Sequence, residues 1–411
     1  MYDKLFSPAK IGNCEIKNRV VMTAMGVCVA EPNGVAGKRF SDYYEERAKG
    51  GVGLIITEVT RVNKTHGVAL PGQLSMTDDS KIEPFSKVVD KVHSHGTKIF
   101  VQLHHAGRQN LAAIGTMWHP LEIMGNIFPP MWKMMYFAGS KVEIDMDILN
   151  TPLMVWAQNT FLRPDVSASD VVCGEGVSFV KNQPTRPLKI KEIKSLEQEF
   201  VDAAVRVKKS GADGVELHAS HGYLIQQFLS PYTNRRKDEY GGSLENRMRF
   251  LLEIIAGIRE ACGKDFPLMV RLSVEEFYDA IGMGDVGIKL PEGIEMAKIL
   301  EKAGVDAINV SCATYETLNH LIEPMSFPQG WRSYLAKAVK DVVSIPVVAV
   351  GVIRDPDQAE ALLESGNQDF IGLGRPLLAD PYWAKKAQEG NADLIQRCIG
   401  CVSCFESLEK N

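Results

Sequence analysis

Eight short apolar runs, each followed by an amphipathic helical pattern, restrict this chain to a small number of folds. This alternation is typical of βα units around a parallel sheet, whose strands are covered on both faces and are therefore apolar throughout. Several of the helical patterns end in glycine, which closes a helix in the left-handed conformation before the next strand. The predicted strands are residues 19–25, 53–59, 98–103, 214–218, 267–273, 306–311, 346–351 and 369–374.

Eight such units in 411 residues predict a (β/α)8 TIM barrel rather than an open doubly wound sheet. No predicted strand is directly followed by G-x-G-x-x-G, the motif of dinucleotide sites in open sheets, which favours the same fold. We expect the barrel to span residues 1–390, with residues 391–411 forming a separate cysteine-rich tail.

A long insertion, residues 111–187, interrupts the alternation after the third strand, before a helix that begins near Lys191. It is far longer than an ordinary βα loop and holds seven of the sixteen methionines and three of the five tryptophans. One interpretation is a small subdomain with its own apolar core. The other is a lid over the C-terminal face of the barrel, because a Met-rich and aromatic surface suits a bulky apolar ligand.

The charge and hydropathy of the chain indicate which kinds of molecule it can bind. The net charge of −5 contains no block of like charge, which argues against a nucleic acid or an anionic membrane as partner. No run reaches ~18 apolar residues, and the N-terminal stretch MYDKLFSPAKIGNCEIKNR is charged where a signal peptide is apolar. We therefore expect a cytoplasmic protein that binds a small molecule.

The ends of the predicted strands carry the polar residues that matter, because barrel active sites lie at the C-terminal ends of the strands. Glycine-rich turns after the last two strands predict a site for a phosphate-bearing cofactor. Arg271 needs an anionic partner, and Gln102 can both donate and accept along the edge of a pyrimidine ring. The candidates at the strand ends are Thr23, Ala24, Met25, Gly26, Glu58, Gln102, His218, His221, Tyr223, Arg271, Gly351, Gly374 and Arg375.

Two histidines and a tyrosine follow the fourth strand in the order His218, His221, Tyr223. Histidines of this kind are often satisfied structural groups, and a zinc site would need a third ligand that the sequence does not place. At a strand end, however, they can donate hydrogen bonds to one carbonyl oxygen while the tyrosine gives a proton to a nearby carbon.

The segment HASHGYLIQQFLSPYTNRRKDEYGGSLENR resembles the signature of the old yellow enzyme family of flavin-dependent ene reductases. LFSPAKIGNCEIKNRVV, VQLHHAGR, MVRLS and IGLGRPLLADP follow in the family's order, so the resemblance covers essentially the whole chain except the insertion. It implies FMN bound to a (β/α)8 barrel.

The resemblance also implies roles for single residues. His218 and His221 match the pair that binds the substrate carbonyl, and Tyr223 matches the proton donor. Ala24 stands where members often have proline, and Val59 where they usually have a smaller residue. Flavin-ring and phosphate contacts are implied for Thr23, Ala24, Met25, Gly26, Val59, Gln102, Arg271, Gly351, Gly374 and Arg375.

The tail RCIGCVSCFESLEKN carries Cys398, Cys401 and Cys404 at ligand spacing, which alone would suit zinc as well as iron. It resembles the [4Fe–4S] motif of long family members such as 2,4-dienoyl-CoA reductase and trimethylamine dehydrogenase, whose fourth cysteine would fall beyond Asn411. Those members also carry an FAD- and NAD(P)H-binding half that this sequence lacks. We expect the chain to be either a truncated or separately encoded front half, with such a half or subunit as partner, or a naturally short enzyme with a vestigial motif, and a homo-oligomer is compatible with both.

The leading hypothesis is NAD(P)H-dependent reduction of an activated C=C bond by FMN. We expect a large apolar substrate, such as a steroid- or bile-acid-like enone or an enoyl- or dienoyl-CoA. Two alternatives are amine oxidation of the trimethylamine dehydrogenase type and a non-catalytic electron-transfer subunit.

Overall fold

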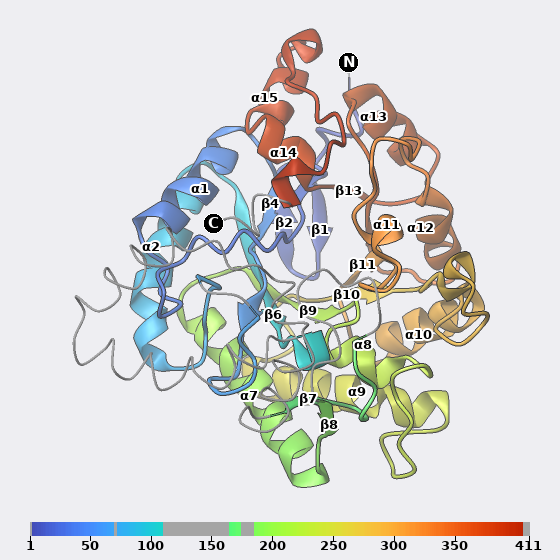
Figure 1. The fold of residues 1–411 in the computed structure, drawn as a ribbon. Helices are drawn as coiled ribbons and strands as arrows, with labels where there is room; N and C mark the ends of the chain where they lie inside the picture. The colour runs from blue at the N-terminus through green and yellow to red at the C-terminus, as the bar shows by residue number, and fades with distance from the viewer. Residues whose placement is uncertain (1, 70–71, 110–163, 174–184, 406–411) are drawn as a thin grey trace.

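Eight parallel strands close into a barrel in the computed structural model, which describes residues 2–69, 72–109, 164–173 and 185–405 (Figure 1). All eight predicted strands are confirmed; six have bounds within one residue of those expected, whereas the strands predicted at 19–25 and 53–59 end three residues earlier. They are β3 (Val20–Met22), β4 (Leu54–Ile56), β6 (Lys98–His104), β9 (Gly214–Ala219), β10 (Leu268–Ser273), β11 (Ala307–Ser311), β12 (Val347–Val350) and β13 (Phe370–Leu373). The pairings of β13 with β3 and of β4 with β6 close the ring, and the short β5 (Thr60–Arg61) extends β6.

Successive strand residues alternate between two apolar cores, as the period of two in a strand requires. Val20 and Ile55 belong to the outer core between the sheet and the helices. Val21, Leu54 and Phe100 belong to the inner core of the barrel. Fully buried strands of this kind explain why the predicted runs are continuously apolar.

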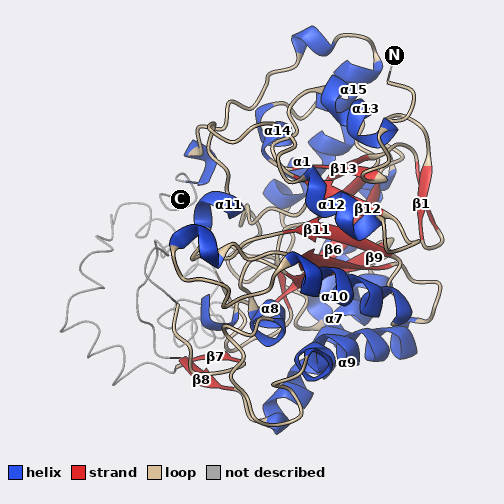
Figure 2. Ribbon diagram, turned by 90° about the vertical axis from the view of Figure 1, so that its right-hand side faces the viewer, coloured by secondary structure: helices blue, strands red, loops and turns tan. Residues whose placement is uncertain are grey.

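An antiparallel hairpin closes the end of the barrel at which the strands begin. It consists of β1 (Ala9–Ile11) and β2 (Cys14–Ile16), and its Ile11 and Ile16 join the inner core. Figure 2 places β1 at the opposite end of the barrel from α8 (Leu224–Leu229) and α11 (Leu318–Leu321), which follow strand ends.

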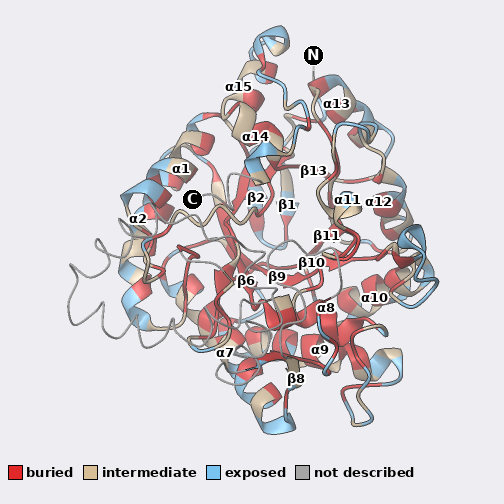
Figure 3. Cartoon of the chain, in the orientation of Figure 1, coloured by how far each residue is buried: buried red, intermediate tan, exposed pale blue. Residues whose placement is uncertain are grey.

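Amphipathic helices surround the sheet, and their buried faces point towards it (Figure 3). The helix expected near Lys191 begins at Ile190, where the Glu192 carboxylate accepts a hydrogen bond from the Lys189 backbone nitrogen at 2.8 Å. In the described part of the chain, no helix combines the length and apolar character needed to cross a bilayer. The remaining helices are α1 (Lys38–Lys49), α2 (Ile82–His93), α7 (Ile190–Lys209), α9 (Leu244–Cys262), α10 (Leu290–Lys302), α12 (Ser333–Lys340), α13 (Pro356–Glu364), α14 (Arg375–Ala379) and α15 (Trp383–Gln388).

Most of the insertion predicted over residues 111–187, and with it the expected lid or subdomain, lies outside the described residues. Its described part contains β7 (Asp165–Ser167), which pairs in parallel with β8 (Thr185–Pro187). β7 packs against α8 and against the turn that follows β6.

Gly50, at the end of α1, provides a test of the packing between the first helix and the C-terminal segment. A Cβ at this position would lie 1.8 Å from the Pro381 carbonyl oxygen, and the Gly50 carbonyl accepts a hydrogen bond from Lys385 N at 2.9 Å. Because neither backbone can move freely, we expect Gly50→Ala to lower the free energy of unfolding by about 2 kcal/mol in urea unfolding. The neighbouring surface control, Lys49→Ala, should change it by less than about 0.5 kcal/mol. Equal losses in the two variants would contradict this account.

Candidate active site

A cavity opens at the C-terminal ends of the barrel strands, and residues that end or follow each of the eight strands line it. Of the predicted site residues, Glu58, Gly351 and Cys401 do not line the cavity, although Val59 beside Glu58 and Val350 and Val352 beside Gly351 do. Those that line it are Thr23, Ala24, Met25, Gly26, Val59, Gln102, His218, His221, Tyr223, Arg271, Gly374, Arg375, Cys398 and Cys404.

Glu216 fixes the direction in which the Gln102 amide points. Its two carboxylate oxygens accept hydrogen bonds from Gln102 Nε2 at 2.7 Å and from Asn309 Nδ2 at 2.8 Å. Burial raises the pKa of Glu216, while the nearby Arg271 and the two amide donors oppose that shift. Because the amide nitrogen of Gln102 is committed to Glu216, its oxygen is presented as an acceptor.

Arg271 is a buried cation from β10 that points to the same part of the cavity. Its Nη1 donates to the Ala24 carbonyl at 3.0 Å. Burial lowers the pKa of Arg271 to about 10, and Glu216 opposes this, so the guanidinium stays charged at neutral pH. Its Nε has no hydrogen-bond partner among the described residues.

The buried polar atoms that lack hydrogen-bond partners in this region suit the polar edge of a flavin ring. Thr23 Oγ1, Gln102 Oε1 and Arg271 Nε are buried and lack partners within the described residues. Each such atom costs about 1–3 kcal/mol when left unsatisfied. Together they offer acceptors and a cationic donor to the polar edge of a flavin. A Cβ on Gly374 would lie 3.2 Å from Met25 Sδ, so glycine also keeps the wall of the cavity open there.

A second group of cations lies at the part of the cavity expected to hold the phosphate. Glu323 binds Arg332 in a buried ion pair, and its other oxygen lies 3.0 Å from Arg375 Nη2. Arg354 also lines the cavity, and its Nη2 has no partner among the described residues. Three guanidinium groups and one carboxylate leave a net positive charge, which suits a phosphate. The sequence prediction included Arg375 but missed the other three residues. Arg354 lies in the glycine-rich turn after β12 that was predicted to bind the phosphate, whereas Glu323 and Arg332 lie in a segment without a recognisable motif.

His218, His221 and Tyr223 converge on one part of the cavity. The two imidazole centroids are 5.0 Å apart, and that of His218 is 4.8 Å from the Tyr223 ring. Each histidine uses one ring nitrogen on a serine: His218 Nδ1 lies 3.1 Å from Ser220 Oγ, and His221 Nε2 lies 2.7 Å from Ser311 Oγ. The other nitrogen of each ring is therefore available to a ligand.

Burial sets the protonation state of these three groups. It lowers the pKa of His218 and of His221 well below the usual value and raises the pKa of Tyr223 well above it. The histidines are therefore neutral and the tyrosine protonated at neutral pH. His221 also has a backbone φ of 63°, a strained conformation for a residue with a side chain, which is typical of functional positions.

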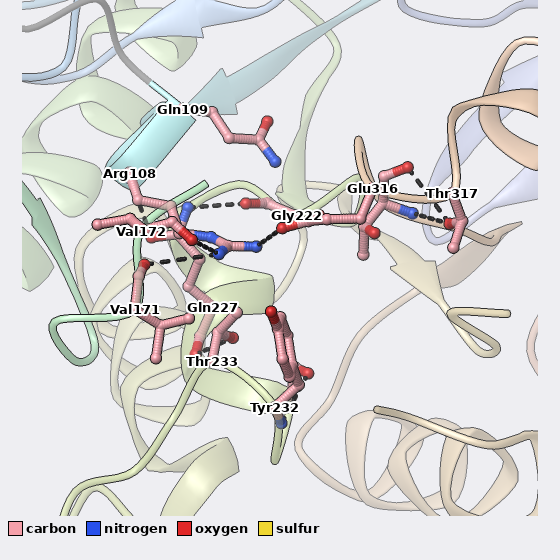
Figure 4. Close-up of polar contacts among 12 residues, drawn as sticks. Arg108, Gln109, Val171, Val172, Gly222, Gln227, Tyr232, Thr233, Glu316 and Thr317 are labelled. Carbon is pink, nitrogen blue, oxygen red and sulfur yellow. Dashed lines mark hydrogen bonds and ion pairs between the residues drawn. The ribbon is translucent and has the colours of Figure 1, made fainter. Parts of the chain in front are cut away.

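Tyr315 is a cavity residue that the sequence prediction missed. Its hydroxyl lies 2.6 Å from that of Tyr223, and either oxygen can be the donor. The loop that carries it is held by the buried ion pair between Arg108 and Glu316. Figure 4 shows Arg108 reaching Glu316 on one side and the carbonyl of Val172, at 2.7 Å, on the other. A tyrosine in a loop after the sixth barrel strand gives no signal in a single sequence.

The tail lies beside the same cavity, because Cys398, Cys404 and Phe405 line it. Cys401 is exposed. Among the residues described, no group of three or more metal-ligating side chains converges. The observed arrangement therefore does not by itself fit a metal cluster.

Comparison with known proteins gives a family. The model of the NADH:flavin oxidoreductase / NADH oxidase family matches residues 4–114 and 128–393. The NADH oxidase of Thermoanaerobacter brockii is 44% identical over 405 residues, which is 98% of this chain and 54% of that protein. The cinnamate reductase of Clostridium sporogenes is 35% identical over 424 residues, 99% of this chain and 56% of that protein.

A solved structure of 2-naphthoyl-CoA reductase with 2-naphthoyl-CoA superposes with a TM-score of 0.81 at 28% identity, covering 98% of this chain and 54% of that one. The chain thus spans about half the length of each of these three proteins. The family match runs through the barrel strands and through every part of the cavity described above except the tail. The chain therefore belongs to the NADH:flavin oxidoreductase / NADH oxidase family, the old yellow enzyme group that its sequence resembles.

Proposed function

We propose that this protein is an ene reductase that reduces the C=C bond of an α,β-unsaturated carbonyl compound. The observation that carries the proposal is the convergence of two neutral histidines and a protonated tyrosine in the cavity that also holds the flavin-binding groups. Cinnamate reductase and 2-naphthoyl-CoA reductase, both similar to this chain, are named for the reduction of conjugated acyl compounds, which supports it.

When bound, FMN would supply the hydride, with NAD(P)H as the source of its electrons. His218 and His221 would donate hydrogen bonds to the carbonyl oxygen, where negative charge accumulates as hydride adds to the β-carbon. Two such donors contribute a few kcal/mol (~3) to lowering the barrier. Tyr223 would then give its proton to the α-carbon, which completes the addition of H⁻ and H⁺ across the double bond.

The walls of the cavity support a large apolar substrate. Met25, Val27, Leu321 and Ile322 contribute apolar side chains to the wall. A bulky steroid-like enone, or an aromatic or long enoyl thioester, would bury more apolar surface there than a short aldehyde.

Amine oxidation is less compatible with the described wall. A cationic amine would need a carboxylate or an aromatic cage. Within the described lining, Glu323 is the acidic side chain, and Arg332 and Arg375 already hold it. The aromatic side chains there are Tyr223, Tyr315 and Phe405, and the two tyrosine hydroxyls are hydrogen-bonded to each other at 2.6 Å.

An anaerobic assay distinguishes the candidate functions. The NAD(P)H-reduced protein should be reoxidised by a conjugated enone, with a stoichiometric loss of the C=C bond measured by mass spectrometry. The oxidised protein should keep its flavin absorbance when a tertiary amine is added. Bleaching by the amine would support the dehydrogenase alternative, whereas inertness towards both compounds and towards artificial electron donors would support an electron-transfer subunit.

Tyr223→Phe tests the proton donor. Because the hydroxyl is lost while the ring is kept, flavin reduction by NAD(P)H should stay within about twofold, and reoxidation by the enone should slow by about 10²-fold or more. Stopped-flow absorbance measures both half-reactions. The control is Tyr240→Phe, a buried tyrosine outside the cavity whose hydroxyl lies 2.8 Å from Glu253, and it should keep both rates. Unchanged enone reduction in Tyr223→Phe would remove the tyrosine from the mechanism.

The tail cysteines call for a metal analysis. Cys398, Cys401 and Cys404 do not form a converging group of ligands among the described residues, and the proposed reduction assigns them no role. The [4Fe–4S] cluster, and an FAD- and NAD(P)H-binding half or subunit that would feed it, stay predictions. We expect the anaerobically purified chain to bind well below about four iron atoms per flavin, and Cys401→Ala to bind still less. A full complement of four iron and four sulfide in the chain alone would contradict this.

A further inference from the structure

A third histidine, His104, lies beside the proposed proton donor. It is the last residue of β6 and has no solvent exposure. It stands two residues after Gln102, so its side chain leaves the strand on the same face. The His104 ring centroid is 4.3 Å from that of Tyr223, with the planes nearly perpendicular at 83°, and 5.4 Å from that of His218.

Gln73 fixes which nitrogen of His104 carries the proton. The Ala69 backbone N–H donates to Gln73 Oε1 at 2.9 Å, so this atom is the amide oxygen. The other end of the amide, Nε2, is therefore the donor to His104 Nδ1, at 3.1 Å. Burial lowers the pKa of His104 to about 3, so the ring is neutral and carries one proton. With Nδ1 accepting, that proton is on Nε2.

The resulting Nε2–H is a buried donor without a conventional acceptor in the described part of the chain. Leaving a buried donor unpaired is unfavourable for folding, so a structural role alone does not account for it. The electron-rich ring of Tyr223 lies beside His104, nearly perpendicular to it, and offers an acceptor surface for an N–H donor.

We propose that His104 is a positioning residue for Tyr223, whose Nε2–H faces the tyrosine ring and makes its hydroxyl a better proton donor. When Tyr223 gives up its proton, the negative charge spreads into the ring, and the positive end of the N–H dipole stabilises that anion more than the neutral phenol. The inference rests on the proposed ene reduction, in which Tyr223 supplies the proton.

Two substitutions distinguish the effect of the His104 N–H donor from that of its aromatic ring. His104→Phe keeps an aromatic ring and removes the N–H, whereas His104→Gln keeps an N–H donor at a similar reach. We expect His104→Phe to slow reoxidation by the enone about tenfold and His104→Gln to stay within about threefold, with flavin reduction by NAD(P)H unchanged in both. The control is His105→Gln, at the residue that directly follows β6, since both ring nitrogens of His105 have partners, His66 Nδ1 at 2.9 Å and Gly107 N at 3.0 Å. Its ratio of half-reaction rates should not change.

A double-mutant cycle tests whether His104 acts through Tyr223. In a Tyr223→Phe background, His104→Phe should cause no further loss of enone reduction, because the proton donor is already absent. Equal losses in His104→Phe and His104→Gln, or a loss that persists in the Tyr223→Phe background, would overturn the proposal in favour of simple packing.

A substrate-free measurement keeps this inference separate from the proposed function. Nitrogen-15 NMR of histidine-labelled protein should show the Nε2–H tautomer of His104 between about pH 6 and pH 8. Tyr223→Leu, which removes the aromatic ring, should shift that proton resonance. The Nδ1–H tautomer, or an unmoved resonance, would overturn the role of His104 even if enones are reduced. Failure of the wild-type protein to reduce any enone, with these spectra as expected, would instead refute the proposed function.

Discussion

Closure of the parallel sheet is the constraint on which the rest of the molecule depends. The ring is completed by short ladders, in which Ile371 lies opposite Val20 and Leu54 opposite Lys98. Because all eight strands run in one direction, closure brings every C-terminal end to one rim. Side chains that are far apart in the sequence, such as Thr23 and Arg271, therefore share one cavity. The same closure creates an inner core, which the N-terminal hairpin caps at the other end.

Buried charges in this rim are arranged to face the cavity rather than to strengthen the fold. A buried ion pair is a weak source of stability because desolvation offsets the attraction between the charges. Glu323 nevertheless holds Arg332 and Arg375 in place, and both guanidinium groups line the cavity. Glu216 plays the same part for the Gln102 amide. In each case a carboxylate fixes the position of a donor or acceptor through a direct hydrogen bond or ion pair, which is how a preorganised site lowers a barrier.

The sequence was sufficient for the barrel because a covered parallel strand has a simple pattern. The strand predicted at residues 98–103 is observed as β6, Lys98–His104. The strand predicted at residues 19–25 is observed as the shorter β3, Val20–Met22, because Thr23 and the residues after it leave the sheet and line the cavity. Strand-end reasoning also found Gln102 and Arg271, whose positions follow from the strands themselves.

Cavity residues that lie in loops could not be predicted from the positions of the strand ends. Arg332 and Tyr315 come to the cavity only through the path of their loops, which tertiary contacts decide. The buried pair of Arg108 and Glu316 is one such contact, and nothing in either local sequence predicts it. The turn at Gly351 was predicted as part of the site, but the residues beside Gly351, rather than the glycine itself, line the cavity.

The cations that suit a flavin also decide which group can act as the acid. Burial is the main cause of the lowered pKa of His221, and the charges of Arg271 and Arg332 lower it further. For His218, burial is again the first cause, followed by its histidine neighbours and Arg271. A neutral imidazole donates a hydrogen bond readily but gives up its proton only by becoming an anion, which is unfavourable in a buried site. In the proposed reduction, both histidines are restricted to binding, so the proton for the α-carbon is assigned to a hydroxyl, and Tyr223 contacts His218, Tyr315 and the cavity together.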